Sequence, residues 1–117
     1  IAVVKVLIEA ACDVNQARTT DGCTPLFTAS QFGHTDIVAI LLGASGIQIN
    51  QHNNNNLTPL NIASDYGNTE IVRLLLQQPN IDLNKKAFNK SPLESATNNN
   101  HSEIIQLLCE INFTALL

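Results

Sequence analysis

The sequence repeats itself, and this repetition constrains the possible folds more than any other feature. The triplets Thr24-Pro25-Leu26, Thr58-Pro59-Leu60 and Ser91-Pro92-Leu93 begin 34 and then 33 residues apart. Further positions return in the same register: Ala29, Ala63 and Ala96; Gly33, Gly67 and Asn100; Ile37-Val38, Ile71-Val72 and Ile104-Ile105; Leu41, Leu75 and Leu108. A period of this length indicates small supersecondary units that bury their apolar faces against one another. Residues 1–8 align with the second half of a unit, so we interpret the opening segment as a half repeat.

Each unit is predicted to contain two short helices. The first begins at a capping Thr or Ser followed by proline, which suits the first helical position because its missing N–H has no intrahelical partner there. Glu94 stands three residues after Ser91, which predicts a capping box. The first helix should end at Gly33, Gly67 or Asn100, since Gly and Asn tolerate a left-handed backbone.

The second helix is predicted to start at Thr35, Thr69 and Ser102, each acting as a cap and each followed by an acid. Polar turns follow, with Gly22, Asn56 and Asn89 expected at positive φ. The first full unit is one residue longer than the second, and we predict a bulge near Ser45-Gly46 to hold the extra residue.

Helices this short are marginal in isolation, because isolated helices in water need roughly 12–15 residues. The predicted fold is therefore an all-α solenoid of stacked helix-turn-helix units joined by extended β-turn or hairpin connections. The ends, residues 1–8 and 115–117, are apolar, and we expect further repeats beyond both.

Composition argues against several classes of function. A formal charge of −4 does not favour nucleic-acid binding, and we interpret Lys85, Lys86 and Lys90 as a solvated loop. The three cysteines, Cys12, Cys23 and Cys109, form neither a disulfide framework nor a metal motif, which favours an intracellular, cytoplasmic location. We expect no cofactor, no metal, no membrane insertion and a monomeric chain.

The repeat pattern resembles the ankyrin family. Gly22-Cys23-Thr24-Pro25-Leu26, Ala29, Gly33-His34, Ile37-Val38 and Leu41-Leu42 carry the resemblance most completely. We divide the chain into a partial repeat at 1–20, repeats at 21–54 and 55–87, and a truncated repeat at 88–117, all in one ankyrin repeat domain. Phe27, Asn61 and Glu94 depart from the histidine that the family usually has after the Thr-Pro-Leu triplet.

The resemblance implies a non-catalytic scaffold that binds a protein partner on a concave surface of turn tips and first helices. The positions that this implies as partner-binding residues are Thr20, Asp21, Cys23, Gln31, Phe32, Asn54, Asn55, Leu57, Asp65, Tyr66, Ala87, Phe88, Lys90, Asn98 and Asn99. Phe32 and Tyr66 are equivalent in neighbouring repeats and are candidate anchors, since aromatic residues are enriched among binding hot spots. Packing of both rings against the adjacent helix or turn is the competing interpretation.

Other functions find less support in the sequence. No Ser or Cys has a His and an acid at a spacing typical of a catalytic triad, so we do not expect an enzyme. The alternative is a targeting or autoregulatory arm of a larger enzyme or channel. Asn15, in Asp13-Val14-Asn15, resembles the turn asparagine that is hydroxylated in some ankyrin repeats, although a role in holding the turn is the favoured interpretation.

Overall fold

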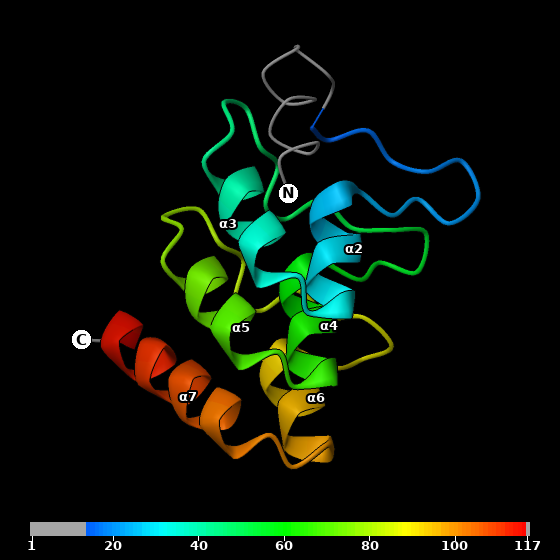
Figure 1. Cartoon of the computed structure of the whole chain (residues 1–117). Coiled ribbons are helices and arrows are strands. Elements are labelled where there is room, and N and C mark those ends of the chain that lie inside the picture. The colour runs from blue at the N-terminus through cyan, green and yellow to red at the C-terminus, as the bar shows by residue number, and fades with distance from the viewer. Residues whose placement is uncertain (1–13, 117) are drawn as a thin grey trace.

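Pairs of helices follow one another along a single stack (Figure 1). The computed structural model describes residues 14–116, and describes side chains as far as residue 111. Its helices are α2 (Pro25–Phe32), α3 (Thr35–Leu42), α4 (Pro59–Tyr66), α5 (Thr69–Leu76), α6 (Pro92–Asn98) and α7 (Ser102–Leu116). The predictions for residues 1–8, for Cys12 and for the side chains of residues 115–117 fall outside the described part.

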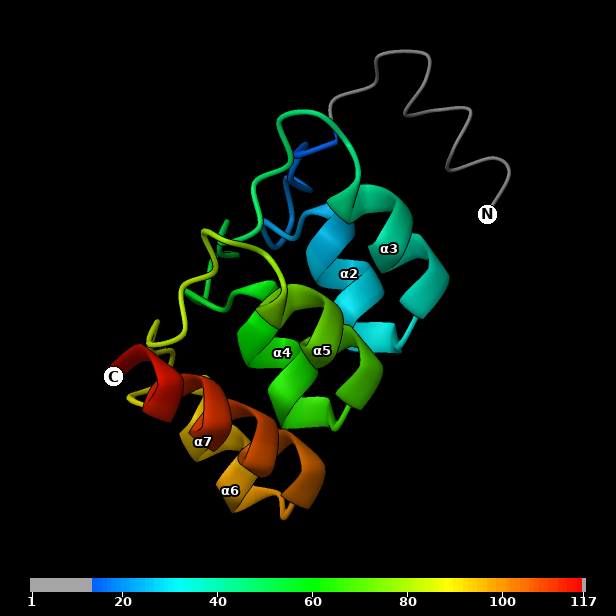
Figure 2. The same ribbon diagram turned by 90° about the vertical axis from the view of Figure 1, so that its left-hand side faces the viewer.

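The helices form two layers, which lie side by side in Figure 1, and in Figure 2 the layer of α3, α5 and α7 faces the viewer. Helices α2, α4 and α6 pack in succession to form the first layer, and α3, α5 and α7 form the second. The described part contains helices and one isolated β-bridge, Ala87 to Lys90, and measures 40 × 28 × 22 Å along its principal axes. This arrangement confirms the predicted all-α stack of helix-turn-helix units.

The first helix of each unit starts at the predicted cap. The Thr24 side chain accepts a hydrogen bond from the backbone N–H of Phe27 at 3.2 Å. The Ser91 and Glu94 side chains form the capping box that the sequence predicted. Thr58 and Asn61 form a second capping box, which was not predicted because Glu or Gln, rather than Asn, is the usual residue at the third helical position. These bonds satisfy N–H groups that a helix start otherwise leaves without partners.

The turn between the two helices of a unit depends on a left-handed residue. Gly33 and Gly67 have φ values of 75° and 77°, and Asn100 has a φ of 58°, as predicted. The prediction that Thr35 and Thr69 cap the second helices is wrong. The cap positions are His34 and Asn68, and neither makes a side-chain capping bond. Thr35 and Thr69 are the first helical residues, so the predicted helix starts are confirmed and only the capping role is wrong.

The core lies between the two layers. Its fully buried members include Leu26 and Leu60 from the first helices and Val38, Val72 and Leu75 from the second. These are the positions at which the sequence repeats, so each unit contributes equivalent side chains to one continuous apolar seam.

The predicted bulge near Ser45-Gly46 is also wrong. After the second helix of the first full unit, the N–H of Ala44 donates to the carbonyl of Leu41, and the N–H of Ile47 donates to the carbonyl of Ala44. The same two bonds occur 34 residues later, from Gln78 to Leu75 and from Ile81 to Gln78. The chain after the second helix is therefore the same in both units. The extra residue lies in the following turn, which is closed between Asn53 and Leu57 in one unit and between Ala87 and Lys90 in the next.

Candidate functional site

The turn tips project from one side of the stack, beyond the first helices (Figure 1). Each tip is closed by a backbone hydrogen bond from an N–H to a carbonyl further along the chain, and the loop that this bond closes becomes shorter from one unit to the next. The N–H and carbonyl groups belong to Arg18 and Cys23 in the first tip, to Asn53 and Leu57 in the second, and to Ala87 and Lys90 in the third. The predicted left-handed residues are confirmed at these tips, with φ values of 75° at Gly22, 64° at Asn56 and 62° at Asn89. Backbone bonds therefore fix the shape of the surface that the tips share with α2, α4 and α6.

Most of the predicted partner-binding side chains reach this surface. The exposed ones are Thr20, Phe32, Asn54, Asn55, Asp65, Tyr66, Phe88, Lys90, Asn98 and Asn99, and the half-buried ones are Asp21, Gln31 and Leu57. Cys23 and Ala87 are each only 5% exposed. Cys23 packs with Phe27 and Ile62 in a small apolar cluster, so its side chain supports the surface from beneath.

Three aromatic side chains stand out on this surface. Phe32, Tyr66 and Phe88 are 62%, 54% and 71% exposed, and they are the exposed large apolar residues of the described part. The Phe32 ring lies 6.4 Å from the His34 ring, and the Tyr66 hydroxyl accepts a hydrogen bond from Gln31 at 3.4 Å. These contacts orient both rings and leave more than half of each side chain open to solvent. Each of the three belongs to the predicted set.

A groove runs beside the last turn tip. It has a volume of about 280 Å³ and is lined by Leu57, Ile62, Asp65, Ala87, Phe88, Lys90 and Ser95. Five of these residues were predicted; Ile62 and Ser95 were missed. Both lie on a first helix, three residues before a predicted site position, and residues at that spacing share a helix face. A search of the same helix face, three residues before Asp65 and Asn98, would have identified Ile62 and Ser95.

Phe88 has an unusual backbone. Its φ is 54°, and with Asn89 it forms the two-residue turn between Ala87 and Lys90. A tight hairpin turn of this kind requires positive φ at both central residues and therefore favours Asn and Gly. A left-handed backbone costs a residue with a β-carbon about 1–2 kcal/mol. Strain of this kind concentrates at functional sites, so Phe88 is a functional candidate on geometry as well as exposure.

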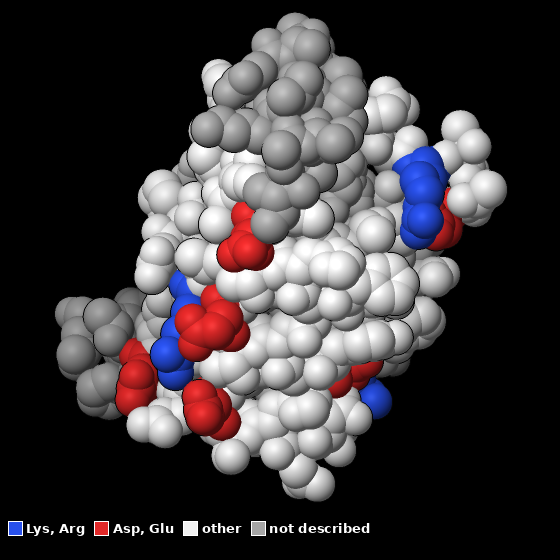
Figure 3. Space-filling view, in the orientation of Figure 1, with Lys and Arg blue, Asp and Glu red and all other residues white. Residues whose placement is uncertain are grey.

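Charged groups at the first turn tip are held by local bonds. The Asp21 carboxylate accepts the backbone N–H of Cys23 at 3.0 Å and pairs with Arg18 at 2.7 Å. The bond from Cys23 and the pairing with Arg18 lower the pKa of Asp21 below its usual value. On the opposite layer, acidic side chains gather around a basic one over α5 and α7 in Figure 3, where Arg73 pairs with Glu70 and Glu103.

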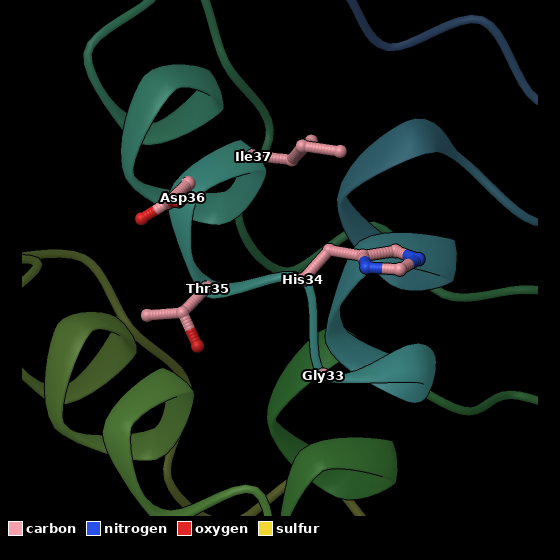
Figure 4. Close-up of a pocket in the computed structure, with 5 residues that line it drawn as sticks. All are labelled: Gly33, His34, Thr35, Asp36 and Ile37. Atoms are coloured by element: carbon pink, nitrogen blue, oxygen red, sulfur yellow. The ribbon is translucent and has the colours of Figure 1, made fainter. Parts of the chain in front are cut away.

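A second hollow lies at the turn between α2 and α3, lined by Gly33, His34, Thr35, Asp36 and Ile37. Figure 4 shows His34 and Ile37 pointing to one side and Asp36 to the other. At the equivalent place in the next units, Asn68 donates to the carbonyl of Ser30 at 2.7 Å, and His101 Nε2 lies 2.9 Å from the carbonyl of Asp65. The residue at this position therefore joins one unit to the one before it.

The turn asparagines have a similar linking role. The Asn15 amide donates to the carbonyl of Gly46 at 2.9 Å and accepts the N–H of Gln48 at 2.8 Å. Asn50 makes the same pair of bonds to Asn80 and Asp82. These contacts support the interpretation that the asparagines hold the turns, and hydroxylation of Asn15 stays a prediction.

Three further features bear on function. Within residues 14–116 no group of three or more His, Cys, Asp or Glu side chains is placed to bind a metal ion. None of the helices in that range combines the length and apolar character that a membrane span needs. Cys23 and Cys109 are both free thiols.

The stacked helix pairs, with turn tips and first helices on one surface, define this chain as a helical repeat solenoid of the kind that presents an extended binding surface. The family follows from sequence comparison, since a family model for ankyrin repeats in three copies matches residues 1–53 and 45–115. The chain belongs to the ankyrin repeat family, whose repeats are in general protein interaction modules and typically non-catalytic. Comparison with curated proteins finds no match.

Proposed function

We propose that this chain is a monomeric scaffold that binds a partner protein through the surface formed by its turn tips and first helices. The observation that carries the proposal is the exposure of Phe32 on α2, Tyr66 on α4 and Phe88 at the last turn tip. Scattered apolar residues on a protein surface need no explanation, but aromatic residues collected on one face mark interaction sites.

The polar groups around the rings suit the same role. Asn99 donates to the Asp65 carboxylate at 2.8 Å, which fixes two exposed side chains of neighbouring units relative to each other. Asn54 N–H donates to the carbonyl of Asp21 at 2.9 Å, which links two turn tips. A surface held in place before binding loses less conformational entropy when a partner docks, which favours affinity.

The free thiols Cys23 and Cys109 suit a reducing compartment, and we propose that the partner is met inside the cell.

The test is affinity capture from the source lysate with the wild-type chain and a Phe32→Ala/Tyr66→Ala variant. Truncation of a hot-spot aromatic weakens binding by about 2 kcal/mol or more, roughly 30-fold, so the variant should lose a partner that the wild type retains. The matched control is Gln77→Ala/Gln106→Ala, which changes two exposed residues of the second layer. Circular dichroism must show the same helical content in all three proteins.

Capture of one protein by the wild type and the control, and its loss from the aromatic variant, supports the proposal. Equal capture by all three proteins places the binding site elsewhere and contradicts it. Self-association in light scattering would contradict the monomeric state.

A further inference from the structure

Positive charge is concentrated at the last turn tip. Three of the six Lys and Arg residues of this chain, Lys85, Lys86 and Lys90, fall within six positions, although the net charge is −4. The sequence alone favours a solvated loop for them. The structure adds that they flank Phe88, and that Lys90 lines the groove beside it.

These lysines differ from the arginines in their partners. Arg18 and Arg73 are both held in ion pairs with carboxylates, whereas no carboxylate of the described residues lies within ion-pairing distance of Lys85, Lys86 or Lys90. Long cationic side chains that are not engaged by the protein's own acids are free to pair with those of a partner.

The nearest acids along the chain are already engaged. Asp82 accepts the backbone N–H of Asn84 at 3.0 Å, and Glu94 accepts the N–H of Ser91 at 3.3 Å as part of its capping box. Across the groove, the Asp65 carboxylate accepts from Asn99 at 2.8 Å. These hydrogen bonds leave the charge on each carboxylate, but none of the three acids forms an ion pair with Lys85, Lys86 or Lys90, so the lysines can still pair with the carboxylates of a partner.

The groove supplies an apolar seat beside that charge. Leu57, Ile62 and Ala87 line it, and the Phe88 ring, 71% exposed, stands at its edge. Its volume of about 280 Å³ lies just below the range of small-molecule pockets, so it suits a protruding side chain better than a whole ligand.

We propose that this groove, with Phe88 and the three lysines, binds an acidic peptide segment that carries one bulky apolar side chain. The inference rests on the proposed function and deepens it by naming the chemistry of the partner. The apolar side chain enters between Leu57 and Phe88, and carboxylates on either side of it pair with the lysines. The left-handed backbone of Phe88 fixes the direction in which its ring is presented.

A peptide is favoured over other anionic partners by the same observations. Nucleic-acid binding depends on neutralising several phosphates, and three lysines in a chain of net charge −4 offer few such contacts. The apolar groove would contribute nothing to phosphate binding. In a peptide, by contrast, an apolar side chain between acidic residues can occupy it.

The experiment is fluorescence anisotropy with a labelled seven-residue peptide that has phenylalanine at its centre and three glutamates on each side. One control peptide carries alanine at the centre, and another carries lysine flanks. We expect saturable binding of the first peptide, weakened about tenfold by central alanine and abolished by lysine flanks. Raising NaCl from 50 to 500 mM should weaken it about tenfold, because salt screens exposed charge pairs.

Protein variants assign the binding to the groove. Replacing all three lysines with alanine, or Phe88→Asn alone, should weaken binding about tenfold or more. Asparagine tolerates the left-handed turn, so Phe88→Asn removes the ring without adding backbone strain. The matched control is Arg73→Ala, which removes a positive charge from α5 and should leave the affinity unchanged.

Several outcomes overturn the inference. One is the absence of saturable peptide binding at about 1 mM protein, and another is a lysine-flanked peptide that binds as tightly as the glutamate-flanked one. A third is a loss of affinity in Arg73→Ala as large as in the lysine variant. The last is tighter binding of a single-stranded oligonucleotide or of phosphatidylserine vesicles than of the peptide. The lysine variant should also enter the lysate capture. If it and the wild type retain a partner that Phe32→Ala/Tyr66→Ala loses, the proposed function stands and this inference fails.

Discussion

Gly67 ends α4 at φ 77°, in a place where the next unit leaves no room for a side chain. A β-carbon at this position would lie 2.7 Å from Cε1 and 2.8 Å from Nδ1 of His101. The same imidazole contacts the carbonyl of Asp65 through Nε2 at 2.9 Å. We therefore predict that Gly67→Ala has two effects, one on the local backbone and one on the contact between units.

The magnitude follows from those two effects. Alanine in the left-handed region costs about 1–2 kcal/mol. The His101 ring can swing away from the added methyl group, so the second cost is one lost hydrogen bond, about 1 kcal/mol. The unfolding free energy should fall by about 2–3 kcal/mol. Gly46→Ala is the matched control, because Gly46 has a φ of 78° and an added β-carbon meets nothing within 4 Å, which leaves only the backbone cost.

Urea unfolding followed by circular dichroism measures the difference, which should be about 1 kcal/mol between the two variants. In a His101→Ala background there is no ring to displace, so Gly67→Ala should then cost no more than Gly46→Ala. Equal losses for Gly67→Ala and Gly46→Ala in the native background would refute the reasoning. So would a cost of Gly67→Ala that does not change when His101 is removed.

Three further predictions test the links within and between units. Asn50→Ala removes the bonds to Asn80 and Asp82 and should lower the unfolding free energy by about 1–2 kcal/mol in urea titrations; a loss below about 0.5 kcal/mol would contradict the linking role. The buried Ser64 hydroxyl has no partner in the described part of the chain, so Ser64→Ala should raise the thermal midpoint, whereas Ser30→Ala, which loses a bond to the Leu26 carbonyl, should not. The pKa of Asp21 is lower in the folded state than in the unfolded state, so the ionised carboxylate stabilises the fold. This stabilisation is fully present above the unfolded pKa of about 3.9 and is lost as the pH falls through the lower pKa of the folded state. The advantage of the wild type over Asp21→Asn in urea midpoint should thus be larger at pH 6 than at pH 2, and an advantage that is the same at both would contradict it.

The predictions that held depend on residue type and local spacing. Thr24 and Ser91 cap helices because a short hydroxyl side chain reaches the N–H three residues on. Asn56 and Asn89 take positive φ because Asn tolerates it. The two errors also arose locally, since the cap of the second helix and the place of the extra residue depend on where a turn closes, which spacing defines only to within a residue or more.

The candidate site was predicted less completely, because exposure depends on what packs nearby. Cys23 and Asn55 both belong to predicted turn tips, yet Cys23 is buried against Phe27 and Ile62 while Asn55 is exposed. The groove beside Phe88 combines α4, α6 and two turn tips, and no sequence window contains them all.

By itself the sequence determined the repeat, the helix caps, the left-handed turn positions and the apolar seam, because each depends on residues a few positions apart or on an exact recurrence of type. Only the tertiary structure decided which side chains of the turn tips are open, that Asn68 and His101 join neighbouring units, and that Phe88 and Lys90 border a groove. These properties arise from contacts between residues about one repeat apart, whose distances are set by how the units stack.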